Sequence, residues 1–196
     1  MGILRKIFAG GLGWVLGGPI GLVVGVAVAS LIDGDFTAPE PRKRVSNHTS
    51  QSDFMMAMLV LLAAVMKADG RLLRTELDVI KSYLRQIFDE ETALEALQIL
   101  KGLLKQDIDV ESVAVQVGAN LNASAKREML HMLFSVGYAD GSLSRSEEAL
   151  LLKIASLMGI SEADARSIQA MFGKDTNPNW AYDVLEIQST ASDDEV

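Results

Sequence analysis

Four acidic residues form two identically spaced pairs and are the side chains best suited to chemistry. Asp69 and Glu76 are repeated, 71 residues later, by Asp140 and Glu147. Carboxylate oxygens are hard ligands for divalent cations, so the four residues would form a metal site if the chain brought them together. The favoured interpretation is structural: each Asp orders a turn, and each Glu begins a helix.

The two pairs belong to an internal repeat. The segment Lys67-Ala68-Asp69-Gly70-Arg71-Leu72 recurs as Tyr138-Ala139-Asp140-Gly141-Ser142-Leu143. Each copy predicts a helix, a tight turn and a second helix, with the Gly at positive φ and the Asp bonded to the turn backbone. The Leu that ends each segment is expected to insert between the two helices.

The spacing Asp-Gly-x-Leu-x-x-x-Glu also matches the second half of a calcium EF-hand loop. In such a loop the earlier ligand positions need oxygen-bearing side chains. Here they are held by Val65, Lys67, Val136 and Tyr138. A standard EF-hand is therefore excluded, and only a looser site shared between the copies remains open.

Apolar residues at helical spacing predict seven helices between Ser52 and residue 173. One of them is expected to begin at the acidic Asp89 and to carry an inward leucine stripe at Leu94, Leu97, Leu100, Leu103 and Leu104. No stretch alternates with period two, so we expect an all-α domain. Ser144 with Glu147, and Ser161 with Asp164, have the spacing of helix N-caps, and Gly159 suits a helix C-cap. Four methionines could line an adaptable groove but are expected in the core: Met55, Met56, Met58 and Met66.

An N-terminal segment of residues 7–32 carries no charged side chain. As one helix it would be about 39 Å long, against about 30 Å of bilayer hydrocarbon, so it predicts a transmembrane anchor. Two alternatives remain open. Gly17-Gly18-Pro19 could break the helix into a re-entrant hairpin, and Ala27-Val28-Ala29 resembles a signal-peptidase site, although the apolar stretch is longer than signal peptides have.

Glycines recur every fourth residue within this segment, at Gly13, Gly17, Gly21 and Gly25. On a helix they share one face and let a second helix approach closely in lipid. The spacing therefore predicts helix packing and a homodimer.

Composition excludes several functions. The formal net charge is -8, which argues against nucleic-acid binding. The chain has no Cys, and its two histidines are His48, in a linker over residues 33–51, and His131, between apolar helix neighbours. No catalytic triad, phosphate-binding loop or metalloprotease helix is present, so we expect no enzyme and no cofactor beyond a divalent metal.

The paired Ala-Asp-Gly-x-Leu-x-x-x-Glu hairpins resemble the TerB domain of tellurite-resistance proteins, over about residues 52–172. The resemblance implies an all-helical module of about seven helices without enzymatic activity. It also implies that the clustered acidic residues are candidates for metal binding, which here are Asp69, Glu76, Asp140 and Glu147.

The C-terminal residues 174–196 are similar to the start of a J-domain, through Tyr182, Leu185 and Ala191. With the anchor and the TerB-like domain, this order resembles the DjlA-type family of membrane-anchored DnaJ-like co-chaperones. The resemblance implies an inner-membrane, single-pass protein whose TerB-like domain faces the cytoplasm and whose J-domain engages a DnaK-type chaperone.

The His-Pro-Asp tripeptide of J-domains does not occur before Val196. We therefore expect that a longer chain completes the J-domain, and that residues 1–196 alone do not stimulate a DnaK-type ATPase. The alternative is a TerB-like tellurite or stress-response protein that binds metal or a partner at the membrane.

Overall fold

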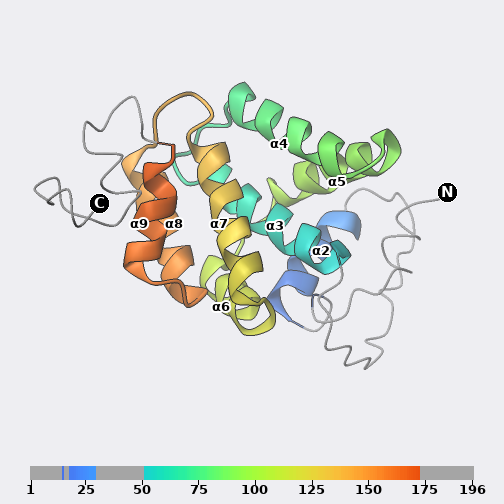
Figure 1. The fold of residues 1–196 in the computed structure, drawn as a ribbon. Coiled ribbons are helices and arrows are strands. Elements are labelled where there is room, and N and C mark those ends of the chain that lie inside the picture. Colours follow the sequence, from blue (N-terminus) through green and yellow to red (C-terminus); the bar gives the residue numbers. More distant parts are fainter. Residues whose placement is uncertain (1–14, 16–17, 30–50, 173–196) are drawn as a thin grey trace, which may run out of the picture.

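The computed structural model describes Val15, residues 18–29 and residues 51–172, and these residues form helices and no strand (Figure 1). The all-α prediction is confirmed. The helices are α2 (Pro19–Ala29), α3 (Gln51–Met66), α4 (Arg74–Ile87), α5 (Glu90–Leu103), α6 (Val110–Asn120), α7 (Ala123–Gly137), α8 (Arg145–Leu157) and α9 (Glu162–Ala170).

Helix α3 is the centre of the fold. Every residue from Met55 to Met66 is buried, on all sides of the helix. The neighbours that enclose it are α2, α5, α6, α7 and α8. The sequence predicted only an apolar stripe on α3, and the structure differs because helices surround it completely. The four methionines lie in the core, as expected.

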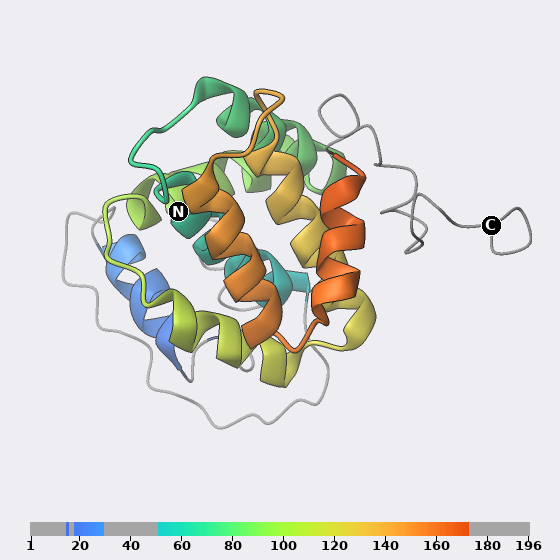
Figure 2. The ribbon, with the colours of Figure 1, turned by 90° about the vertical axis from the view of Figure 1, so that its left-hand side faces the viewer.

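The two repeats form the hairpins α3–α4 and α7–α8, which pack against each other through α3–α7, α4–α7 and α3–α8 contacts. Helices α5 and α6 connect them, and α9 closes the fold against α7 and α8. Figure 2 shows the resulting ring of helices around α3, with the turns of both hairpins at the same end.

Helix ends follow the predicted capping chemistry. Asp89 and Ser161 each accept a hydrogen bond from a backbone N–H three residues on. Gly159 has φ of 77°, and the N–H of Ile160 donates to the Ala155 carbonyl, which closes α8. These local interactions satisfy helix-end groups that would otherwise lack partners, so they can be read from sequence.

The buried face of α5 differs from the predicted leucine stripe. Leu94, expected inside, is 51% exposed, whereas Ala93 and Ala96 are buried. Alanine side chains are small and let neighbouring helices come close at these positions. A prediction based on large apolar residues therefore misses part of the buried face.

Helix α2 begins at Pro19, a residue suited to a first helical turn. This start coincides with the Gly17-Gly18-Pro19 break, and the earlier residues of the 7–32 segment, apart from Val15 and Gly18, fall outside the described part of the chain. Within that described part, no helix combines the length and apolar character needed to cross a bilayer.

Candidate acidic site between the two hairpins

The two repeat turns have nearly the same geometry. Gly70 has φ of 76° and Gly141 has φ of 90°. The Oδ1 of Asp69 accepts the N–H of Arg71 at 2.8 Å, and the Oδ1 of Asp140 accepts the N–H of Ser142 at 3.0 Å. Both predicted roles, the Asp that orders the turn and the Gly at positive φ, are confirmed.

The two glutamates begin the second helix of each hairpin. Glu76 Oε2 accepts the N–H of Leu73 at 3.0 Å, and Glu147 Oε2 accepts the N–H of Ser144 at 2.9 Å. Ser144 completes a capping box because its Oγ accepts the Glu147 N–H. The equivalent position in the first hairpin is Leu73, which has no side-chain acceptor, so that helix start is only half capped.

These capping glutamates are buried, which the sequence did not indicate. Glu76 is 1% exposed and Glu147 is 5% exposed. Carboxylates are seldom so deeply buried unless they are paired or protonated. A helix-start role alone would leave them at the surface, so their burial follows from the packing of one hairpin against the other.

A cavity of about 190 Å³ lies where the two turns meet. Asp69, Asp140 and Glu147 line it, and Glu76 lies close enough for the charges of Glu147 and Asp69 to act on it. The structure thus brings the two predicted acidic pairs together. Arg71 and Ser142, which occupy equivalent repeat positions and were not predicted as site residues, line the same cavity.

The pKa of Glu76 is raised into the neutral range. Burial is the main cause that raises its pKa, from 4.5 to about 7, and the backbone N–H of Leu73 opposes it. The charges of Glu147 and Asp69 raise the pKa further, as does a hydrogen bond that protonated Glu76 donates to Glu147. The raised pKa of Glu76 therefore depends on the packing of one hairpin against the other.

The geometry limits what this site can hold. Within residues 18–29 and 51–172, no three His, Cys, Asp or Glu side chains are grouped closely enough to hold a metal ion. One oxygen of each candidate carboxylate accepts a backbone N–H, so metal binding would depend on the second oxygens and on loss of the Glu76 proton. An all-oxygen set of this kind suits hard cations such as Ca²⁺ or Mg²⁺.

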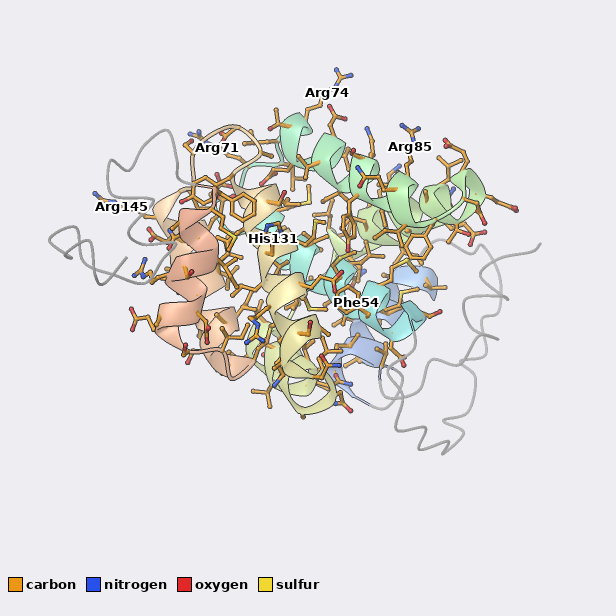
Figure 3. All side chains as sticks on the ribbon, in the orientation of Figure 1. Phe54, Arg71, Arg74, Arg85, His131 and Arg145 are labelled. Atoms are coloured by element: carbon orange, nitrogen blue, oxygen red, sulfur yellow. The ribbon has the colours of Figure 1, made fainter. Side chains whose placement is uncertain are left out.

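The arginines near the turns differ in position. Arg71 lies at the cavity, whereas Arg74 and Arg145 point away from the protein (Figure 3). The Arg74 side chain is 92% exposed and forms an ion pair with Asp78 at 3.9 Å. Arg71 is thus the arginine of the repeat turns that lines the cavity.

The Leu that follows each turn behaves differently in the two hairpins. Leu143 packs against the core, beside Gly137, as predicted. Leu72 is 59% exposed, so the prediction is wrong for the first hairpin. The residue equivalent to Gly137 is Met66, whose side chain is buried.

The other predicted sites lie mostly outside the described residues, namely Gly13, Gly17, His48, Tyr182, Leu185 and Ala191. Gly21 and Gly25 lie on α2, and a Cβ added at Gly25 would meet no described atom within 4 Å. His131 is exposed on α7, with its ring 4.7 Å from that of Phe172. This position agrees with a boundary residue.

We call the place where the two turns meet, with Asp69, Glu76, Asp140 and Glu147, the acidic junction. A bundle of two related helical hairpins with such a junction defines a TerB-like domain. Residues 55–170 match the sequence model of the tellurite resistance protein TerB, and this match covers more than half of the chain, so the chain belongs to the TerB family. Residues 1–48 match the sequence model of the co-chaperone DjlA transmembrane domain. The predicted combination of a TerB-like domain with a DjlA-type anchor is confirmed.

Two curated relatives are both called co-chaperone protein DjlA. The Haemophilus influenzae protein is 23% identical over 180 residues, and the Pasteurella multocida protein is 24% identical over 180 residues. Each alignment covers 87% of this chain and 62% of the relative. The chain therefore spans less than two thirds of the length of these relatives. No solved structure matches it significantly.

Proposed function

We propose that this chain is the membrane-anchored region of a DjlA-type co-chaperone. In this proposal the TerB-like domain is a non-enzymatic interaction and sensing module that precedes a J-domain for a DnaK-type chaperone. The observation that carries it is the succession of an anchor match over residues 1–48 and a TerB match over residues 55–170. Relatives named as DjlA co-chaperones align across both segments.

The arrangement of the fold supports an interaction role rather than catalysis. The acidic junction has two exposed turns above a small cavity, and its buried carboxyl pair is held by backbone N–H groups. Such groups are positioned by the fold and respond to charge or pH, but no nucleophile or general base faces a substrate-sized cleft there. We place the domain at the inner membrane, facing the cytoplasm.

The proposal is tested by ATP hydrolysis. The natural coding sequence is read beyond Val196 for a His-Pro-Asp, and the extended chain is reconstituted in lipid nanodiscs with a DnaK-type chaperone. We expect the extended chain to stimulate hydrolysis and residues 1–196 alone to give none. Equal rates with and without the extension, or a continuation without His-Pro-Asp, would overturn the co-chaperone proposal.

A second candidate is divalent cation binding at the acidic junction, favoured by the convergence of Asp69, Asp140 and Glu147 on one cavity. Calorimetric titration with Ca²⁺ or Zn²⁺ tests it on the wild-type chain and on the double substitution Asp69→Asn with Asp140→Asn. Binding at this junction is supported if the wild-type chain gives a binding heat and the doubly substituted chain gives none. A flat titration of the wild-type chain ends this candidate.

A further inference from the structure

Helix α2 fills an apolar groove on the TerB-like domain. Its inward residues Ile20, Val24, Ala27 and Val28 are all buried. They pack on the surface formed by α3, α5 and α6, which we call the α2 groove, and Figures 1 and 2 show α2 beside these helices. The TerB match begins at residue 55, so α2 is an addition to the family domain.

Two contacts make this seat specific. A Cβ added at Gly102 on α5 would lie 3.0 Å from the carbonyl oxygen of Ala27 and 3.2 Å from its Cβ, so the crossing needs glycine. Gln116 on α6 accepts the backbone N–H of Ile20 with Oε1 at 3.1 Å. That N–H belongs to the first turn of α2 and has no partner within its own helix.

The outward face of α2 is apolar as well. Leu22 is 71% exposed and Val26 is 46% exposed, and the sequence PIGLVVGVAVA has no polar side chain. A helix that is apolar on all sides suits a lipid or fully buried environment. The groove buries only one side, whereas a bilayer would bury both.

The same residues lie within the segment that matches the DjlA transmembrane domain. A helix surrounded by lipid cannot at the same time lie against α3, α5 and α6. We propose that α2 exchanges between the α2 groove and the lipid bilayer, so that the groove is the docking site for the chain's own anchor helix. Insertion of α2 then uncovers an apolar surface on the TerB-like domain.

A disulfide reporter can follow the docked state because the 196-residue chain has no Cys. A Cβ added at Gly18 would lie 2.8 Å from the Cδ of Gln116, so positions 18 and 116 face each other and the pair Gly18→Cys with Gln116→Cys can report docking. Gln116→Cys removes the acceptor of the Ile20 N–H, so this pair tests docking through the apolar contacts that remain. The full chain carrying this pair is made by cell-free synthesis with and without phosphatidylcholine vesicles. Intramolecular disulfide is read by mass, and insertion by carbonate-resistant association with vesicles.

A groove variant and a matched control separate docking from insertion. Gly102→Leu places a side chain against Ala27, whose atoms are the three nearest to the added Cβ, and it leaves α2 itself unchanged. Gly25→Ala is the control because its added Cβ meets no described atom within 4 Å. Helix content by circular dichroism verifies that each variant folds.

We expect the disulfide in the absence of vesicles and about a tenfold lower ratio of bridged to free chain when vesicles are present, equivalent to about 1.4 kcal/mol. Gly102→Leu abolishes the disulfide without lowering insertion, and Gly25→Ala changes neither. If vesicles leave the ratio of bridged to free chain unchanged, α2 is a fixed part of the domain and the exchange is overturned. No disulfide without vesicles, or one only between two chains, would overturn docking within the chain.

Discussion

The two hairpins share a turn and differ in what supports it. Both turns have a Gly at positive φ and an Asp that accepts the N–H two residues on. Beneath the second turn, Gly137 leaves room for Leu143, and Ser144 caps the next helix. Beneath the first, Met66 fills the core, Leu72 is exposed, and the cap position is a Leu.

This difference shows which parts of the repeat are constrained by local geometry. The turn needs particular residue types in both copies because its backbone conformation and hydrogen bonds depend on them. The packing beneath it differs: the first copy buries Met66 from its first helix, and the second packs Leu143, which follows its turn, against the core.

The largest expected effect is at Met66. Met66→Ala removes a buried side chain and leaves a cavity that exposed Leu72 cannot fill without moving the turn. We expect the free energy of unfolding to fall by about 2–5 kcal/mol, measured by urea denaturation. Leu72→Ala is the control and should change it by less than about 0.5 kcal/mol. Equal losses would show that Leu72 shares the packing role.

The converse change is at Gly137. A Cβ there would lie 2.6 Å from Leu143 Cδ1, the end of a flexible side chain that can shift, so Gly137→Ala should destabilise the chain by about 1–2 kcal/mol, the low end of overpacking costs. The cost arises from one neighbour, and Gly137→Ala combined with Leu143→Ala should therefore lose less than the sum of the two single losses. Additive losses in the same denaturation assay would show that packing between Gly137 and Leu143 is not what distinguishes the second hairpin.

Glu76 should make stability depend on pH. Its pKa is about 7 in the fold and near 4.5 ordinarily, so the folded chain binds more protons between these values. Its contribution is fully present below about pH 4.5 and is lost as the pH rises through 7, by on the order of 1–2 kcal/mol after solvent screening.

Glu76→Gln should remove this fall, because an amide cannot ionise. Urea denaturation at about pH 5 and about pH 8 compares the two chains. Glu90→Gln, which alters a carboxylate that is 66% exposed, is the control and should keep the wild-type dependence. If Glu76→Gln kept the wild-type pH dependence, a group other than Glu76 would be its cause.

The smallest expected effect concerns the helix caps. Ser144→Ala removes a side-chain acceptor from the N-terminus of α8 and should cost about 1 kcal/mol. Leu73→Ala, at the equivalent place before α4, removes no cap bond. Thermal unfolding should therefore show a loss of stability for Ser144→Ala and no loss of a cap for Leu73→Ala. An equal loss in the two variants would contradict the difference between the hairpins.

Much of the fold was accessible from local sequence. The all-α class, the repeat, the helix starts at Asp89, Ser144 and Ser161, and the C-cap at Gly159 were predicted correctly. Each depends on hydrogen bonds and dihedral angles within a few residues, and these are fixed by residue type. The acidic pairs were also found from the repeat alone.

Contacts between distant segments could not be read in this way. Only tertiary structure decided that α3 is enclosed on all sides, that Leu94 and Leu72 lie outside, and that Glu76 is buried with Glu147 and has a raised pKa. It also decided that α2, within a segment apolar enough to predict an anchor, lies in a groove made by α3, α5 and α6. Sequence sets what each helix can bury, but burial, and the pKa that follows from it, depend on which helices arrive from elsewhere in the chain.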